Sequence, residues 1–485
     1  MSPIQTRKPR PKTKIVCTLG PSTKSEETMR VLIENGMSVA RLNLSHGDLE
    51  THTADIAQVR HLSDQLGVPV GIMVDVPGSK YRTGPLGSGV ANLKAGETLT
   101  LTSDDLTGSE EIMSVSPPGI HRDATVGLHI LLDDGLVELI VTAIDGHNVR
   151  CEVIVGGRIT ERRGVATPGK APSLELLGPE AQKALRFAAE QQADFVAMSM
   201  VTKDSDVHSV RKMLDDYGVD ALIISKIERA EALKNLDSIL DASDGIMVAR
   251  GDMGVEVPLA RVPIIQKDLI SRCNYAGKFV ITATQMLESM VNSPVPTRAE
   301  VTDVANAIFD GTDAIMLSGE TSVGQHPGQA VKVMSDVALE AEAALPYERI
   351  ISEKVGQQQT DDAISYDACR TAFQLKASVI VAFTESGRTA NRVSKYRPQP
   401  PILALTPHAR VRQRMTLRWG VIPVIAQVVE SIEDFFLNGQ EQAMEAGLAD
   451  EGDLVVLVAG LPIGLRGTTN LLRVMTISSS ESDSQ

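Results

Sequence analysis

Two carboxylates stand one strand–helix repeat apart in the chain, and each closely follows a short apolar run. Glu228 follows the run at residues 221–225, and Asp252 follows the run at residues 245–249. Short apolar runs bounded by polar residues are typical of buried parallel strands, so neighbouring strands would bring both carboxylates to one edge of a sheet. Two oxygen ligands beside Lys226 suit a hard divalent cation and an anionic substrate. Taken alone, each carboxylate is also explained as an ordinary acidic cap of a loop.

Composition narrows the class of protein and of partner. The 485 residues predict about three domains, and a hydrophobic content of 42% supports large cores. A net charge of −15 argues against nucleic acid or an anionic membrane as the main partner, and an aromatic content of 3% disfavours stacking on bases. An anionic substrate would therefore need lysine, arginine or a metal ion concentrated at its site.

The cysteine pattern and the ends of the chain bear on localisation. The 4 cysteines include no CxxC pair, which fits a reducing cytosol better than a disulfide framework or a zinc site. No apolar run is long enough to cross a membrane, and the basic segment at residues 7–14 leads into no apolar signal core. We therefore expect a soluble, cytoplasmic protein with a disordered tail at residues 478–485.

Strand-like apolar runs alternate with helical patterns along most of the chain. Eight such runs begin near Lys14, Val39, Pro69, Asp194, Ala221, Gly245, Lys278 and Asp313. Helical patterns cover residues 25–35, 51–66, 179–192, 203–217, 262–276, 298–309 and 328–344. Eight alternating units predict a (β/α)8 barrel, although a doubly wound open sheet would have the same local pattern.

A polar residue stands near the end of nearly every predicted strand. In chain order these residues are Asn43, Ser45, Asp75, Ser199, Lys226, Glu228, Asp252, Thr284, Ser318 and Glu320. Active sites of (β/α)8 barrels lie at the carboxyl ends of the strands. Because stability alone does not explain such a set, the pattern predicts an active site at that face.

The repeat is interrupted between about residues 79 and 164. This stretch has short β-like runs at residues 98–102, 136–142 and 149–155, with Asp-Gly turns between them. It predicts a small β domain inserted after the third barrel strand. Such a module can close over the barrel mouth as a lid, and an inert insertion is the alternative.

A third α/β pattern begins near residue 346, with predicted parallel strands at residues 377–383, 402–405 and 454–459. The segment Thr384-Glu385-Ser386-Gly387-Arg388-Thr389 follows the first of these strands and precedes a helix. Hydroxyls, backbone N–H groups and an arginine at a helix N-terminus can bind an anion. An ordinary helix cap explains the segment equally well.

Together, several motifs in this order resemble the pyruvate kinase family over nearly the whole chain. They are K-I-V-C-T-L-G-P-S at 14–22, A-R-L-N-L-S-H-G at 40–47, S-K-I-E-R at 225–229, A-R-G-D-M-G at 249–254, A-T-Q-M-L-E-S-M at 283–290, P-T-R-A-E-V-T-D-V-A-N at 296–306, I-M-L-S-G-E-T at 315–321 and K-Y-R-P at 395–398. The resemblance implies a (β/α)8 catalytic barrel at residues 1–78 and 165–345, a small β-barrel lid at 79–164 and an α/β effector-binding domain at 346–477.

The resemblance also implies an activity and its partners. The family transfers the phosphoryl group of phosphoenolpyruvate to ADP, giving pyruvate and ATP in glycolysis, and is usually tetrameric. This reaction needs charge compensation and positioning more than covalent chemistry. We therefore expect Mg²⁺ or Mn²⁺ as cofactor and a homotetramer. A sugar phosphate or a nucleotide is the expected effector, held by Thr384, Ser386, Gly387, Arg388 and Thr389.

Residue roles carry over motif by motif. Glu228 and Asp252 match the family's metal ligands, and Lys226 matches the lysine that stabilises the transferring phosphoryl group and the enolate. Arg41 and Arg82 match arginines that contact the phosphate.

The remaining carried-over roles concern proton supply and the nucleotide. Thr284 matches a threonine beside the enolate, and Ser318 and Glu320 fit a relay that supplies its proton. Gly251 belongs to the substrate-binding set, and Asn43 and His46, with Arg82, lie on the nucleotide side.

The chain departs from the family pattern on the nucleotide side. Ser322-Val323-Gly324 replaces the usual Ala-Lys-Gly, so one lysine expected near the nucleotide is absent. Glu180 also stands where a lysine is common. These departures predict relaxed or altered nucleoside specificity.

A further departure concerns the monovalent cation. In many members potassium is held by residues that correspond to Asn43, Ser45 and Asp75, and a glutamate stands five residues after the aspartate. Here that position is Lys80. The family's potassium-independent members resemble this chain in carrying lysine there, so we expect no potassium requirement. A solvated lid lysine is the alternative.

Two other functions fit some of the residues. A metal-dependent lyase or aldolase that stabilises an enolate would use Glu228, Asp252 and Lys226, but it would need neither Arg82 nor a nucleotide. A non-catalytic sugar-phosphate sensor would be expected to have lost the metal pair or Lys226, and all three are present.

Overall fold

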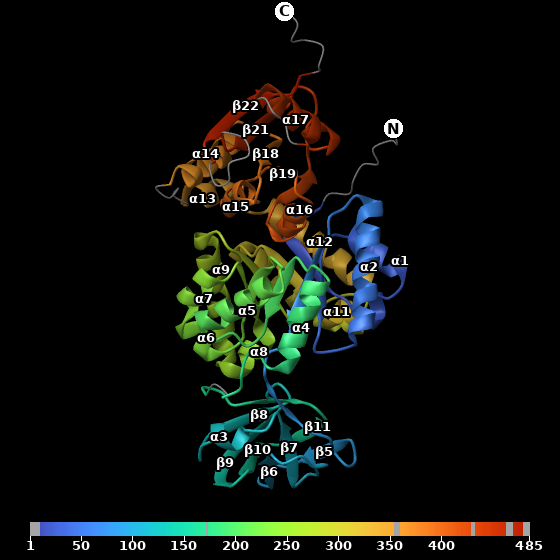
Figure 1. Cartoon of the computed structure of the whole chain (residues 1–485), viewed down its shortest axis with the longest axis vertical. Coiled ribbons are helices and arrows are strands. Elements are labelled where there is room, and N and C mark those ends of the chain that lie inside the picture. Colours follow the sequence, from blue (N-terminus) through green and yellow to red (C-terminus); the bar gives the residue numbers. More distant parts are fainter. Residues whose placement is uncertain (1–9, 171–172, 354–358, 428–431, 462–468, 479–485) are drawn as a thin grey trace, which may run out of the picture.

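The computed structural model describes residues 10–170, 173–353, 359–427, 432–461 and 469–478. Three bodies lie along the longest axis of the molecule, with the barrel between the lid and the C-terminal α/β domain (Figure 1). The predicted disordered tail falls, but for Ser478, outside the described residues. No helix of the described residues is long and apolar enough to span a membrane.

The central body is a closed barrel of eight parallel strands, as predicted. Its strands are β1 (Lys14–Thr18), β2 (Met37–Asn43), β3 (Gly71–Val76), β13 (Phe195–Met198), β14 (Leu222–Ile227), β15 (Gly245–Ala249), β16 (Phe279–Ala283) and β17 (Ala314–Leu317). β1 pairs with β17, which closes the barrel and excludes the open-sheet alternative. Residues of β3, β13, β15 and β16 are buried throughout, which explains their continuous apolar sequences.

Helices surround the barrel and cover the outer faces of its strands (Figure 1). They are α1 (Glu26–Glu34), α2 (Leu49–Leu66), α4 (Pro179–Glu190), α5 (Asp204–Asp216), α6 (Ala230–Lys234), α7 (Leu236–Ala242), α8 (Arg250–Glu256), α9 (Val262–Ala276), α10 (Arg298–Asp310), α11 (Gly319–Ser322) and α12 (Pro327–Ala343). Their ends follow local sequence signals. Thr297 and Glu300 form a capping box at the start of α10, and Gly277 ends α9 at φ 68°.

The lid is a second, smaller closed barrel with strand order β10-β6-β7-β4-β12-β8-β9. Its elements are β4 (Tyr81–Thr83), β5 (Val90–Leu93), β6 (Thr98–Thr102), β7 (Ile112–Ser116), α3 (Ile120–Asp123), β8 (His129–Leu132), β9 (Val137–Asp145), β10 (Asn148–Val155), β11 (Gly157–Thr160) and β12 (Gly164–Ala166). The chain enters it through β4 and leaves through β12, and these two strands pair with each other. The lid has its own apolar core, so it can move as a unit.

The C-terminal body holds a five-stranded sheet with strand order β20-β19-β18-β21-β22. Its elements are α13 (Tyr347–Glu353), α14 (Thr360–Gln374), β18 (Val379–Phe383), α15 (Arg388–Lys395), β19 (Ile402–Thr406), α16 (Ala409–Arg414), β20 (Val421–Ile425), α17 (Ile432–Glu445), β21 (Leu454–Ala459) and β22 (Leu471–Thr476). The predicted strands β18, β19 and β21 are parallel. The sequence analysis missed the two edge strands, β20 and the antiparallel β22.

The C-terminal body also closes the amino-terminal end of the catalytic barrel. Leu417 is fully buried and belongs to the same apolar cluster as Phe195, Phe279 and Met316 inside the barrel. The Arg418 guanidinium lies 4.6 Å from the centre of the Phe279 ring, a cation–π distance. One end of the barrel is therefore sealed by packing, and the opposite, carboxyl-terminal end is open to the lid.

Candidate active site

A cavity of about 500 Å³ lies between the carboxyl ends of the barrel strands and the lid. The barrel contributes most of the residues predicted from the strand ends, namely Asn43, Ser45, Asp75, Ser199, Lys226, Glu228, Asp252 and Thr284. It also contributes Arg41 and His46, which were expected from the family resemblance. The lid and its connecting segments contribute Lys80, Arg82, Asp133, Asp134, Glu161, Arg162, Arg163 and Gly164. One wall of the cavity therefore belongs to the barrel, and the opposite wall belongs to the lid.

Glu228 lies at the end of β14, where its side chain is only 1% exposed. One carboxylate oxygen is 3.0 Å from Lys226 Nζ, and the other accepts a hydrogen bond of 2.7 Å from the Met200 backbone N–H. Burial raises the pKa of Glu228, and the negative charge of Asp252 adds to this, although Lys226 opposes the shift. Because burial disfavours its ionised form, this carboxylate is stabilised by a cation placed beside it.

Lys226 lies at the centre of the charged cluster. Its Nζ donates to Ser199 Oγ at 2.7 Å and to Asp75 Oδ1 at 3.3 Å, and it faces Glu228 as well. Burial alone would lower the pKa of Lys226, but Asp75 and Glu228 outweigh burial and raise it. The ammonium group therefore stays charged at neutral pH while it faces the cavity.

Arg41 is held in place from two sides at the end of β2. Asp75 accepts hydrogen bonds from Arg41 Nε at 2.9 Å and lies 2.8 Å from Nη2, and Arg41 Nη1 donates to Thr18 Oγ1 at 2.8 Å. Burial would raise the pKa of Asp75, but Lys226 and Arg41 lower it. The resulting fork geometry leaves little freedom to the guanidinium, which suits it to orient an anionic group.

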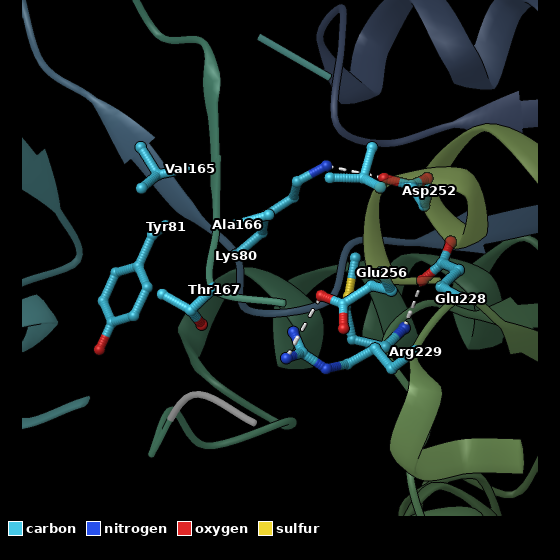
Figure 2. Close-up of a pocket in the computed structure, with 11 residues that line it drawn as sticks. Lys80, Tyr81, Val165, Ala166, Thr167, Glu228, Arg229, Asp252 and Glu256 are labelled. Carbon is cyan, nitrogen blue, oxygen red and sulfur yellow. Dashed lines mark hydrogen bonds and ion pairs between the residues drawn. The ribbon is translucent and has the colours of Figure 1, made fainter. Parts of the chain in front are cut away.

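Asp252 lies in the first turn of α8, where its partner is a residue of the lid connection. Lys80 Nζ is 2.7 Å from Asp252 Oδ1 (Figure 2). Burial would raise the pKa of Asp252, but the charge and the hydrogen bond of Lys80 outweigh it and lower the pKa. Lys80 therefore pairs with Asp252, a predicted metal ligand. It does not pair with Asn43, Ser45 or Asp75, which correspond to the potassium ligands of many family members.

The donor set fits a divalent cation. Glu228 and Asp252 line the same cavity just beyond the ends of the neighbouring strands β14 and β15, and carboxylate oxygens are ligands that Mg²⁺ prefers. No group of three or more His, Cys, Asp and Glu side chains within the described ranges is arranged to hold a metal ion. Two carboxylates suffice for Mg²⁺, because this ion keeps several waters and substrate oxygens.

Thr284 follows β16 in a backbone conformation that a β-branched residue rarely adopts, with φ 69°. Its Oγ1 accepts a hydrogen bond of 2.9 Å from the Gly251 N–H and donates to the Ala283 carbonyl. Arg250 Nη2 donates to the Thr284 carbonyl at 2.6 Å, and Arg250 is itself paired with Asp303 at 2.7 Å. Sequence reasoning missed Arg250, although it stands inside the A-R-G-D motif.

Ser318 and Glu320 are not among the residues that line the cavity. Glu320 is fully buried, and its carboxylate accepts hydrogen bonds from the backbone N–H groups of Leu287 and Ser318. Ser318 Oγ is buried and has no hydrogen-bond partner among the described residues. Glu320 therefore supports the loop that follows Thr284, and neither side chain lines the cavity.

Several lid residues that line the cavity were not predicted as site residues. Asp133, Asp134 and Arg162 have φ values of 50°, 55° and 58°, so they occupy tight turns that face the barrel. The sequence signal for the first two is the Asp-Asp-Gly turn at residues 133–135. Turn chemistry alone does not reveal which body the turn will face.

The anion-binding segment of the third domain has the predicted position at the start of α15. Gly387 caps this helix at φ 83°, and the side chains of Ser386 and Arg388 are exposed. Thr384 and Thr389 are buried, and Thr389 Oγ1 lies 3.0 Å from Thr469 Oγ1. An exposed arginine and serine at a helix N-terminus are compatible with a phosphate group.

Comparisons with known proteins agree with this geometry. The family model for the pyruvate kinase barrel domain matches residues 10–331, and the model for the pyruvate kinase alpha/beta domain matches residues 362–475. A pyruvate kinase of Geobacillus stearothermophilus is 45% identical over 96% of this chain and 80% of its own length. The pyruvate kinase of Clostridium acetobutylicum is 43% identical over 96% of this chain and 99% of its own length. The pyruvate kinase of Staphylococcus saprophyticus is 44% identical, with 96% and 80% of the two chains covered. The chain therefore belongs to the pyruvate kinase family.

Proposed function

We propose that the protein transfers the phosphoryl group of phosphoenolpyruvate to ADP. The bond between the enol oxygen and phosphorus breaks, and a β-phosphate oxygen of ADP forms the new bond to phosphorus. The enolate that remains takes up a proton at its methylene carbon and becomes pyruvate. The observation that carries this proposal is one cavity in which Lys226 and Arg41 face Glu228 and Asp252 beneath a separate lid.

Charge compensation explains the role proposed for each residue at the reacting centre. Glu228 and Asp252 would hold Mg²⁺ or Mn²⁺, which would offset the negative charge of the phosphoryl group and of the enolate oxygen. Lys226 would stabilise the same negative charges from the barrel side, because Asp75 and Glu228 raise the pKa of its ammonium and keep it charged. Arg41 orients the phosphoryl group through the fork that Asp75 fixes.

The remaining roles concern the nucleotide, the proton and the assembly. Arg82 on β4 would contact phosphate from the lid, and Asn43 and His46 would lie on the nucleotide side. Burial and the charges of Arg82 and Arg41 lower the pKa of His46. We therefore propose that His46 contacts the nucleotide as a neutral imidazole, through a hydrogen bond and not through a charge. Thr284 would stand beside the enolate, with Gly251, Ser318 and Glu320 in support.

We also propose the larger-scale features that the family resemblance implies. These are the domain limits given above, a cytoplasmic homotetramer and an effector site at Thr384 and residues 386–389. The cysteine pattern supports the cytoplasmic location, the exposed Arg388 supports the effector site, and the homotetramer rests on the resemblance alone.

The assay that tests the transfer measures pyruvate formation with ADP present and with ADP omitted. We expect pyruvate only when phosphoenolpyruvate, ADP and Mg²⁺ are all present. A lyase or aldolase that stabilises an enolate would form its product without any nucleotide, and that result would replace the proposal.

Removing the effector arginine should separate regulation from chemistry. We expect the Arg388→Ala protein to lose activation by sugar phosphates or nucleotides, because its guanidinium is exposed at the N-terminus of α15. Coupling between two sites is typically about 1–3 kcal/mol, so the loss should be seen as a shift in substrate affinity. Initial rates against phosphoenolpyruvate, with a panel of metabolites, measure it. The pocket lies elsewhere if every active metabolite still activates this variant.

Potassium dependence tests the role of Lys80. We expect full activity without potassium, because the ammonium of Lys80 supplies a monovalent positive charge within the cavity. The Lys80→Glu protein should acquire a potassium requirement. Rates are compared in tetramethylammonium and potassium salts with Mg²⁺ constant. Stimulation of the unaltered protein by potassium of about tenfold, equivalent to lowering the activation barrier by about 1.4 kcal/mol, would contradict this assignment.

A further inference from the structure

Every carboxylate on the barrel side of the cavity already has a cationic partner. The three pairs are Asp75 with Arg41 at 2.8 Å, Glu228 with Lys226 at 3.0 Å and Asp252 with Lys80 at 2.7 Å. A divalent cation held by Glu228 and Asp252 would add two positive charges to a cluster that is already balanced. Such binding becomes more favourable when one of the existing cations withdraws, because like charges at close range repel.

Lys80 is the cation that is free to withdraw. Lys226 belongs to barrel strand β14, and its Nζ is also bonded to Ser199 and Asp75. Lys80 instead lies in the short connection between β3 and β4, and Asp252 is its one hydrogen-bond partner within the described part of the chain. Its side chain is also twice as exposed, at 22% against 11% for Lys226.

A displacement of Lys80 would be transmitted to the lid. Tyr81, the next residue, begins lid strand β4, and its hydroxyl donates a hydrogen bond of 2.6 Å to Asp123 inside the lid. The stem of Lys80 also packs on the returning strand β12, where a Cβ on Gly164 would stand 2.9 Å from Lys80 Cε. Figure 2 shows the Lys80 side chain reaching from this connection to Asp252.

We propose that Lys80 competes with the divalent cation for Asp252, so that the metal-free protein keeps its lid tethered to the barrel and metal binding breaks this tether. The inference rests on the metal site of the proposed function. The Lys80 ammonium thus stands in for part of the metal's charge when no metal is bound.

A second contact between the lid connection and the barrel limits how far the lid can move. Arg229, just beyond β14, donates to the Lys170 carbonyl of the lid connection at 2.9 Å. Arg229 is itself paired within the barrel with Glu256 at 3.4 Å, as Figure 2 shows. Neither partner is a proposed metal ligand, so this contact persists when Asp252 binds the cation. Loss of the Lys80 contact therefore loosens the connection at residues 77–81 and leaves this second contact in place.

The test measures metal affinity and lid mobility without substrate. Mn²⁺ binding is titrated by electron paramagnetic resonance in the unaltered protein and in the Lys80→Met protein. We expect Lys80→Met to bind Mn²⁺ about tenfold more tightly, as expected for removal of one charge-assisted hydrogen bond. Lys94→Met is the matched control, since Lys94 is an exposed lid lysine, and its Mn²⁺ affinity should equal that of the unaltered protein.

Hydrogen–deuterium exchange distinguishes loss of the tether from a general effect of charge. In the unaltered protein, Mg²⁺ alone should speed exchange in the connection at residues 77–81. In Lys80→Met, exchange there should already be fast and should not respond to Mg²⁺. Equal Mn²⁺ affinity of the two proteins, or an unchanged response to Mg²⁺ in the variant, would overturn the tether.

The failure of the metal site itself has a different signature. Asp252→Asn should weaken Mn²⁺ binding strongly, whatever Lys80 does. If the unaltered protein binds Mn²⁺ no better than Asp252→Asn, the metal site of the proposed function is wrong, and the competition that rests on it is overturned too.

Discussion

Replacing Lys226 with methionine is expected to lower kcat by about 10²–10³-fold or more, with a much smaller effect on substrate binding. A fixed charge aimed at developing negative charge typically contributes this much to turnover. The ammonium of Lys226 is bonded to Ser199 and Asp75 and faces the cavity, so it needs no reorganisation when charge develops. Steady-state rates over a range of phosphoenolpyruvate concentrations separate kcat from KM.

The control for this variant addresses stability, because removing Lys226 leaves Asp75 and Glu228 with less compensation in a buried cluster. Lys226→Arg keeps the positive charge while changing its position, so it should stay folded and still lose turnover. Lys234→Met, on the exposed end of α6, is the matched substitution that should change nothing. A Lys226→Met protein that is folded, with a change confined to KM, would contradict the assigned role.

Neutralising either proposed metal ligand is expected to abolish most activity while the protein stays folded. Glu228→Gln and Asp252→Asn keep the shape of each side chain but remove its charge, and the ion contributes several kcal/mol of charge stabilisation. A loss of about 10²-fold or more in turnover follows at about 1.4 kcal/mol per factor of ten. Mn²⁺ binding and activity against Mg²⁺ concentration measure the effect.

The exposed Glu231 provides a matched control for the metal-ligand variants, because it lies a few residues from Glu228 but outside the cavity. Glu231→Gln should keep both metal affinity and turnover. Near-normal turnover of Glu228→Gln or Asp252→Asn at low Mg²⁺ would show that the metal site has been assigned to the wrong residues.

The barrel was predictable because its strands are buried on both faces and therefore have continuous apolar sequences. β15 is an example, since Gly245–Ala249 is buried throughout. β20 was missed because Pro423 interrupts its apolar run, and proline is tolerated only because β20 lies at the edge of the sheet. β22 is an antiparallel edge strand whose side chains are partly exposed, so its sequence has no continuous apolar run.

The residues of the active site also divide into those that the sequence predicts and those that it does not. Glu228, Asp252 and Lys226 were predictable because parallel strands deliver their carboxyl ends to one face. The ion pair of Lys80 with Asp252 was not, because it joins residues 172 positions apart and depends on how the lid is placed. Glu320 follows a strand as the other site residues do, yet its carboxylate bonds to the backbone of Leu287 and Ser318 instead of facing the cavity. Strand position gives proximity to the site, but side-chain direction depends on packing.

Phosphorus NMR of one reaction mixture tests the central claim most directly. The protein is mixed with phosphoenolpyruvate, ADP and Mg²⁺, and the phosphoenolpyruvate, ADP and ATP signals are followed while pyruvate is assayed in the same sample. The proposed transfer predicts that one ATP appears for each phosphoenolpyruvate consumed and each pyruvate formed, and that the Lys226→Met protein does this far more slowly. Pyruvate accompanied by inorganic phosphate without ATP, or equal rates for the unaltered and Lys226→Met proteins, would contradict it.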